Sequence, residues 1–400
     1  MGSYVSLDIG RLQVDWGKNF GFANHSCLFL RSDLATATYY YADDVRKVAP
    51  AYVRKLRDMV PRLELLGYSM NTCRQWYEDT AHEARLESPD ADLSFDTFCR
   101  AVRSVDLTRP KYDRPEGEGD DIRLLEWSDL AIGLLRQPEF SAMAEALSAV
   151  AAVNDATLLE AISPYAVLRI LAEDEVKREK AVVWRVEDII RGGYVGRDEI
   201  FEDLPETERR LIVTEGSSDS SILQASLPLV APDVADFFDF VDMKQNYPFT
   251  GTGNQVNFCK GLAKIRMQNR IVVVLDNDTA GREAEQKLRG LALPENIRVM
   301  VLPNLKEMRR FRTLGPSGAA EEDVNGRAVA IECFLDLAFG ASEPPAVRWT
   351  AYNPALEAYQ GELVAKDRYV RAFFKHHADA AYDVRRLTYL WKRILTVCTA

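Results

Sequence analysis

The sequence predicts an α/β protein built from a mostly helical N-terminal domain with a small β element, then a parallel sheet, then a helical C-terminal extension. Three observations support this fold class. Short alternating runs open the chain, and helical spacing then dominates to about residue 190. From residue 211 onward, continuous apolar runs alternate with helix-like segments, which is typical of a parallel sheet covered on both faces. The last part of the chain returns to helical spacing, so the expected domains are 1–200, 208–340 and 341–400.

The composition is that of a globular protein with more than one domain. The chain has 400 residues, of which 47% are hydrophobic and 28% charged. Its apolar runs are much shorter than the roughly 20 residues that span a bilayer, and its first residues lack the layout of a signal peptide. We therefore expect a cytoplasmic protein with no membrane partner. The six cysteines are scattered without a CxxC pair, which argues against a zinc site.

Within the first domain, the expected elements follow one another in a clear order. Strands are expected at 4–9, 12–16 and 26–30, and helices at 51–66, 70–86 and 94–105, with Asn71 and Ser94 as N-caps. A loop rich in proline, glycine and acidic residues covers 109–121. Further helices are expected at 121–136, 139–153, 156–172 and 176–190.

In the second half of the chain, expected strands alternate with expected helices. Strands are expected at 211–214, 237–241, 271–275 and 297–302, and helices at 218–229, 253–267 and 281–290. A long helical segment at 367–396 follows.

Two groups of carboxylates come directly after strands of the expected sheet. Glu215 follows the strand at 211–214 and Asp219 opens the next helix, while Asp276 and Asp278 follow the most apolar strand. In a parallel sheet these positions meet at one edge, and alternate residues of an extended chain share a face. Clustered carboxylates repel one another, and a hard cation such as Mg²⁺ relieves the repulsion. The alternative is a pair of ordinary helix caps and turns.

These two segments, EGSSD at 215–219 and LDNDTAG at 275–281, resemble the motifs of the Toprim domain. That Rossmann-like fold is shared by topoisomerases, bacterial primases, recombination mediators and nucleases of the overcoming-lysogenization-defect class. The resemblance covers about 208–340. It implies that Glu215 acts as a general acid or base and also contacts metal, while Asp276 and Asp278 hold Mg²⁺ or Mn²⁺.

The nuclease branch of the Toprim family implies further site residues. A second metal ion would be held by Asp219 and by an acid after the last core strand, for which Glu332 fits and Glu322 and Asp323 compete. Two ions would then clamp the attacking and leaving oxygens of the reaction. The same branch implies a basic catalytic residue on the C-terminal side of the domain that neutralises negative charge in the transition state, and Lys366 is the candidate.

The net charge of −11 argues at first against a nucleic-acid partner. The charge is unevenly distributed, however, and no acidic residue interrupts the group Lys260, Lys264, Arg266 and Arg270. We predict that these residues, together with Arg282, contact nucleic-acid phosphates. The alternative for 260–270 is the polar face of a surface helix.

The opening MGSYVSLDIG and the region up to about residue 200 resemble the N-terminal domain attached to HEPN or Toprim effectors of bacterial conflict systems. This resemblance implies a sensing, regulatory or oligomerisation module, and hence a regulatory partner protein or a homo-oligomer. The expected activity is Mg²⁺- or Mn²⁺-dependent hydrolysis of DNA or RNA by an antiphage effector, with two ions bound. The alternatives are primase-like nucleotidyl transfer and a non-catalytic, nucleic-acid-binding regulatory role.

Overall fold

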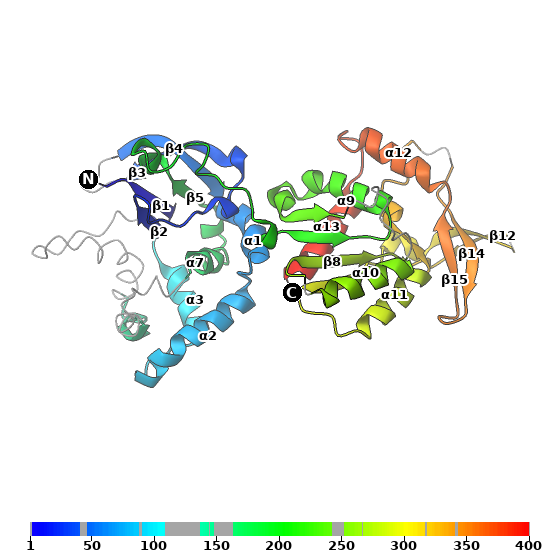
Figure 1. Ribbon diagram of the computed structural model, residues 1–400, viewed down its shortest axis with the longest axis horizontal. Helices are drawn as coiled ribbons and strands as arrows, with labels where there is room; N and C mark the ends of the chain where they lie inside the picture. The colour runs from blue at the N-terminus through cyan, green and yellow to red at the C-terminus, as the bar shows by residue number, and fades with distance from the viewer. Residues whose placement is uncertain are drawn as a thin grey trace, which may run out of the picture. The chain divides into compact units, whose positions relative to one another are not determined.

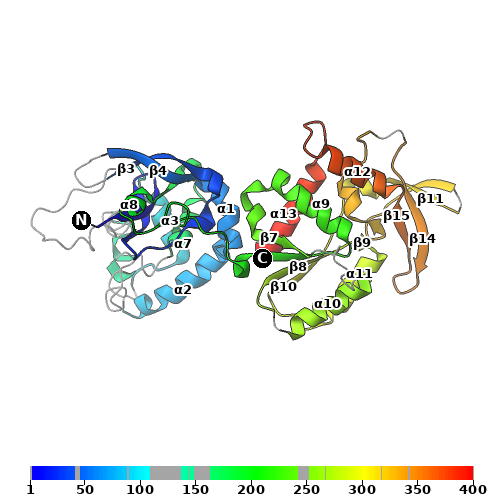
Figure 2. The same ribbon diagram turned by 45° about the horizontal axis from the view of Figure 1, so that its top comes forward.

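The computed structural model describes residues 2–40, 46–87, 90–108, 137–143, 145–147, 163–241, 252–265, 267–316, 318–340 and 343–399. The chain divides into two compact units, Met1–Asp203 and Leu204–Ala400 (Figures 1 and 2). Each unit has its own hydrophobic core. The expected loop at 109–121 and the helix at 121–136 lie outside the described residues, as do residues 144 and 148–153 of the helix expected at 139–153 and residues 156–162 of the helix expected at 156–172.

Unit 1 is organised around an antiparallel sheet in the order β2-β1-β5-β4-β3. Its strands are β1 (Tyr4–Ile9), β2 (Leu12–Lys18), β3 (Leu34–Tyr40), β4 (Arg46–Lys55) and β5 (Ala181–Arg185). The late strand β5 pairs between β1 and β4, where Trp184 lies opposite both Leu7 and Tyr52. The β element of this unit is therefore larger than the sequence predicts.

Three of the elements predicted for unit 1 are wrong. Residues 51–55 and 181–185, expected to be helical, are strands, because pairing between distant segments buries both sets of side chains in one sheet. The strand expected at 26–30 begins instead with a 3-10 turn, η1 (Ser26–Leu28). The side chain of Asn24 causes this turn, because its Oδ1 accepts a hydrogen bond of 2.9 Å from the N–H of Ser26.

The helices of unit 1 are α1 (Leu56–Leu65), α2 (Met70–Glu87), α3 (Phe95–Ser104), α7 (Pro164–Leu171) and α8 (Glu187–Arg191), with the short 3-10 turns η2 (Arg31–Asp33) and η4 (Lys177–Glu179). Ser94 caps α3 as predicted, since its hydroxyl accepts from the N–H of Thr97. Asn71 lies inside α2, so its predicted capping role is wrong. Ser69 takes that place, with its hydroxyl 3.2 Å from the N–H of Thr72.

Unit 2 contains the parallel sheet predicted from the apolar runs, in the order β10-β8-β6-β7. Its strands are β6 (Arg210–Val213), β7 (Phe238–Phe240), β8 (Arg270–Leu275) and β10 (Ile297–Val301). The side chains of 271–275 are all buried, which explains why this strand has no polar alternation. The prediction of an α/β fold with a parallel sheet is thus confirmed.

Helices cover both faces of this sheet (Figures 1 and 2). On one side lie α10 (Thr252–Lys264) and α11 (Thr279–Arg289), and on the other α9 (Ser217–Val230) and α13 (Arg385–Thr399). The indole N–H of Trp391 on α13 donates to the hydroxyl of Ser226 on α9 at 2.9 Å. The end of the chain is therefore a layer of the sheet domain rather than an appendage to it.

A second sheet in unit 2 has the order β12-β11-β14-β15. Its strands are β11 (Phe311–Gly315), β12 (Gly318–Glu322), β14 (Val347–Asn353) and β15 (Ala358–Leu363). The hairpin β14–β15 precedes α12 (Lys366–His376), so the prediction of helix alone after residue 340 is wrong. A short ladder joins β9 (Asn277–Asp278) to β13 (Ala328–Val329). The remaining 3-10 turns are η5 (Glu206–Glu208), η6 (Pro232–Phe237), η7 (Lys306–Arg309) and η8 (Ile331–Phe334).

None of the helices in the described ranges combines the length and the apolar character needed to cross a bilayer.

Candidate metal centre

The segment after β6 places two carboxylates at the carboxyl end of that strand. Glu215 is partly buried two residues beyond β6, and Asp219 lies in the first turn of α9. The N–H of Gly216 donates to Asp219 Oδ2 at 2.9 Å, which fixes the Asp219 side chain across the helix start. Glu215 and Asp219 therefore occupy the same edge of the parallel sheet.

The segment after β8 brings two more carboxylates to this edge. Asp276 follows β8 directly, and Asp278 caps α11 by accepting the N–H of Gly281 at 2.7 Å. The residue between them, Asn277, is buried and donates to the side chain of Asn304 at 2.7 Å. The strand end is therefore pinned to the loop that follows β10.

Gly281 allows α11 to begin close against this strand end. A Cβ atom at position 281 would lie 2.0 Å from the carbonyl oxygen of Asp276. Any side chain here would push α11 away and move the Asp278 carboxylate with it. This contact is the physical reason for glycine in the LDNDTAG segment.

Glu332, on η8, is the fifth acid of the group and is only 4% exposed. Its charge acts on both Asp219 and Asp276. The competing acids are occupied elsewhere: Glu322 accepts from Thr313 and Trp349, and the Asp323 carboxylate accepts from Asn325. Of the three alternatives, the structure brings Glu332 to the other carboxylates.

The pKa values of two of these carboxylates are strongly raised. Burial raises the pKa of Asp219 to about 7, and the charges of Glu332 and Glu215 act in the same direction. Burial also raises the pKa of Asp276 well above its usual value, followed by repulsion from the other four acids. We call Glu215, Asp219, Asp276, Asp278 and Glu332 the acidic cluster. Near neutral pH it must retain protons or be compensated by positive charge.

Gln360 on β15 is a site residue that the sequence did not reveal. Its Nε2 donates to Asp278 Oδ2 at 2.5 Å, and its Oε1 accepts from the N–H of Thr279 at 2.9 Å. Gln360 thereby holds the Asp278 carboxylate and the start of α11 to the hairpin. The alternation of the segment AYQGEL was the available signal for a strand here.

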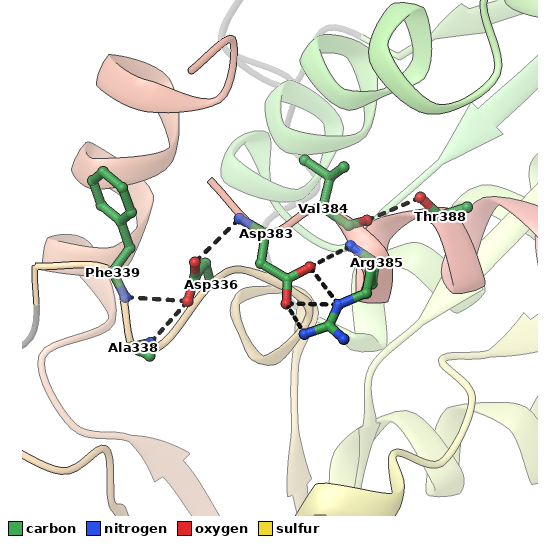
Figure 3. Close-up of polar contacts among 7 residues, drawn as sticks. All are labelled: Asp336, Ala338, Phe339, Asp383, Val384, Arg385 and Thr388. Carbon is green, nitrogen blue, oxygen red and sulfur yellow. Dashed lines mark hydrogen bonds and ion pairs between the residues drawn. The ribbon is translucent and has the colours of Figure 1, made fainter. Parts of the chain in front are cut away.

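A second set of contacts fixes the segment that carries Glu332. The carboxylate of Asp336 accepts from the N–H groups of Ala338, Phe339 and Asp383, at 3.0, 3.1 and 3.1 Å, and Asp383 in turn binds Arg385 (Figure 3). Arg386 also donates to the carbonyl oxygen of Cys333 at 2.7 Å. Residues at and just before the start of α13 therefore hold the chain at two points, Cys333 within η8 and Asp336 just after it.

The residues predicted to contact phosphates lie mostly away from the acidic cluster. Arg270 is the first residue of β8, about 17 Å of strand from the carboxyl end where the acids gather. Lys260 and Lys264 are exposed on the C-terminal half of α10, which leads toward that opposite edge. Arg266 lies outside the described residues.

Two other predicted residues are exposed near the start of a helix. Arg282 lies in the first turn of α11, with its guanidinium against the backbone of Gly326. Lys366 is the first residue of α12, and nothing in the described part of the chain holds it in contact with the carboxylates. The catalytic role of Lys366 stays a prediction.

The donor set of the acidic cluster suits a hard divalent cation, because carboxylate oxygens are the ligands that Mg²⁺ and Mn²⁺ prefer. Burial and the neighbouring carboxylates raise the pKa values of Asp219 and Asp276, and the charge of a bound cation would oppose this repulsion. Across the described residues, no three carboxylate, cysteine or histidine side chains are already gathered closely enough to hold an ion. Binding of a cation would therefore have to draw the carboxylates together.

Comparison with known families places the first half of the chain. Residues 1–208 match the family HEPN/Toprim N-terminal domain 1, which confirms the predicted N-terminal resemblance. No curated protein and no solved structure matches the chain. Because the match covers more than half of the sequence, the chain belongs to the HEPN/Toprim N-terminal domain family.

Proposed function

We propose that unit 2 is a Toprim-type, metal-dependent nuclease that hydrolyses phosphodiester bonds of DNA or RNA. The observation that carries the proposal is the acidic cluster, in which five carboxylates from three segments of the chain gather at the carboxyl edge of a parallel sheet and act on Asp219 and Asp276. Ligands of open α/β sheets bind at that edge. The family name of unit 1 supports a Toprim effector downstream of it.

The residues would divide the work as follows. Asp276 and Asp278 would hold one Mg²⁺ or Mn²⁺ ion, and Asp219 and Glu332 a second. Glu215, at the mouth of the same edge, would contact metal and transfer a proton, and Lys366 would stabilise negative charge on the phosphate. Bound divalent cations supply Lewis acidity and orient the phosphate for in-line attack. Gln360 positions Asp278 and takes no part in the chemistry.

We further propose that unit 1 restrains or directs this nuclease as part of an antiphage system, through a partner protein or self-association. An unrestrained nuclease would damage the nucleic acid of its own cell. The protein-family match of residues 1–208 supports a role of this kind for unit 1.

A basic segment at the acidic edge supports a polyanionic substrate. Lys306, Arg309 and Arg310 follow β10 at its carboxyl end, close to Asn304, which binds the Asn277 side chain between Asp276 and Asp278. All three side chains are exposed, and within the described ranges none has an ion-pair partner. These cations are better placed to guide phosphates toward the carboxylates than those of α10.

Replacing Lys306, Arg309 and Arg310 together with alanine is expected to weaken binding of any nucleic-acid substrate. Each lost phosphate contact should reduce the slope of log affinity against log salt by about 0.7 to 0.9. Replacing Lys260 and Lys264 is the matched control and should change the slope less. Equal losses for the two variants would show that α10 also contacts the substrate.

The direct test of the proposal is incubation of the purified full chain with supercoiled plasmid, single-stranded DNA and transfer RNA, with and without Mn²⁺. We expect cleavage of at least one substrate, only with the metal present. Metal-independent cleavage, or no cleavage of any substrate, would count against a metal-dependent nuclease.

A further inference from the structure

Three aromatic side chains form a row on one face of the hairpin β14–β15. The rings of Tyr352 and Tyr359 have centroids 5.1 Å apart, and those of Tyr359 and Trp349 are 6.4 Å apart. Tyr352 and Tyr359 are each about half exposed, at 52% and 53%. We call Trp349, Tyr352 and Tyr359 the aromatic row.

The inner end of the row is held rigidly. The indole N–H of Trp349 donates to Glu322 Oε2 at 2.9 Å, and the guanidinium of Arg327 lies 4.6 Å from the centre of the indole ring. Trp349 therefore serves as a fixed support for Tyr359. The two tyrosines beyond it present ring surface to solvent.

The same two strands carry the contacts that tie the hairpin to the acidic edge. Gln360, next to Tyr359 along β15, donates to Asp278, and Asn353, next to Tyr352 along β14, donates to Glu283 on α11 at 3.3 Å. Adjacent residues of a strand have Cα atoms about 3.8 Å apart. Because their side chains point to opposite faces, the amides face α11 while the rings face outward. The aromatic row therefore lies on the opposite face of the same strand from Gln360, which contacts Asp278 of the acidic cluster.

Cross-strand packing accounts for only part of this arrangement. Tyr352 and Tyr359 are direct partners in the hairpin register, and an aromatic pair of this kind stabilises a hairpin. Packing alone does not require that half of each ring remain in water at the margin of a proposed phosphodiester-cleaving site. Successive exposed rings are the arrangement on which proteins stack unpaired bases.

We infer that the aromatic row is a stacking platform for the bases of single-stranded nucleic acid, and that unpaired strands are the substrate class of the acidic cluster. This inference rests on the proposed nuclease function. Bases would stack on Tyr352 and Tyr359, and the backbone would continue toward the acidic edge. Paired bases cannot stack in this way because their faces are covered by neighbouring base pairs.

The test measures binding and cleavage separately. Fluorescence anisotropy of a labelled oligothymidylate and of a duplex, with Ca²⁺ in place of Mg²⁺, is compared for the wild type, Tyr352→Ala/Tyr359→Ala and Tyr352→Phe/Tyr359→Phe. The alanine pair should bind the single strand at least about tenfold more weakly, while the phenylalanine pair, which retains the rings, restores most of the affinity. Tyr389→Ala, at a 41% exposed tyrosine of α13, is the control and should bind like the wild type.

The outcomes distinguish this inference from the nuclease proposal. Single-strand binding that depends on the two rings, without any cleavage by the wild type, would support the stacking platform and contradict the nuclease proposal. Metal-dependent cleavage of a single strand at equal rates by the wild type and the alanine pair would retain the nuclease and overturn the platform. Equal loss of duplex and single-strand binding in the alanine pair, or no single-strand binding by the wild type, would also overturn it. Thermal unfolding of each variant shows whether a loss of binding merely reflects a loss of structure.

Discussion

If unit 2 is the proposed nuclease, replacing Asp276 with asparagine is expected to lower the rate of metal-dependent cleavage by at least about 10³-fold, because a central metal ligand would be lost. Asp276 is the residue on which the other four acids of the cluster act. The asparagine side chain has nearly the same shape, so the fold should be retained. Initial rates of cleavage at saturating Mn²⁺ provide the measurement.

Glu295→Gln is a matched control for this variant. Glu295 is exposed in the loop before β10, at the edge of the sheet opposite to the acids, and the substitution removes the same charge. The control should cleave at the wild-type rate. If Asp276→Asn also cleaves at that rate, the acidic cluster is not the catalytic site.

Stability of the metal-free protein is expected to fall as the pH rises from about 4 to about 7. In this range the folded protein keeps protons on Asp219 and Asp276, whose pKa values are raised by burial and by mutual repulsion, while the unfolded chain has already lost them. Deprotonation of Asp219 and Asp276 in the folded protein therefore lowers the free energy of unfolding. The shift of Asp219 alone corresponds to a loss of about 4 kcal/mol, or about 10 °C in the unfolding midpoint of a unit of this size.

Saturating Mg²⁺ should remove most of this loss, because the cation binds the deprotonated carboxylates and replaces the missing positive charge. Asp219→Asn should also flatten the profile, since a neutral amide has no charge to bury. The titration of Asp383 does not contribute to the stability change between pH 4 and 8. Its pKa is lowered to about 2 by the hydrogen bonds from Arg385, so its contribution is lost only below about pH 4. Scanning calorimetry of the wild type and of Asp219→Asn from pH 4 to 8, with and without Mg²⁺, measures these changes. Stability profiles that run parallel for the wild type and Asp219→Asn would contradict the expected effect of Asp219.

The sequence predicted unit 2 more accurately than unit 1, for a physical reason. The runs at β6 and β8 are largely buried on both faces, so their apolar character alone identifies them. In unit 1, β5 is a strand because it pairs with β1 and β4, which lie far away in the sequence. Local spacing contains no information about such partners. It favoured a helix at 176–190, where the structure has a strand and two short helical turns.

The candidate site shows the same division. The four acids Glu215, Asp219, Asp276 and Asp278 stand directly after strands, so the topology of the sheet predicts that they meet. Glu332 reaches them through η8, which is positioned by Asp336 and Arg386, and only the Toprim resemblance pointed to it. Gln360 lies on a hairpin and is 82 residues from Asp278 in the sequence, and no sequence motif identified it as a site residue.

Calorimetric titration of the full chain with Mn²⁺ at pH 8 measures whether the acidic cluster holds divalent cations. We predict saturable binding of one or two ions per chain that is abolished or strongly weakened in Asp276→Asn and Glu332→Gln and retained in Glu295→Gln. Repeating the titration near pH 6.5 should give weaker binding, because protons on Asp219 and Asp276 must then be displaced. Binding that is the same in all four proteins, or absent from the wild type, would show that the acidic cluster is not a metal site.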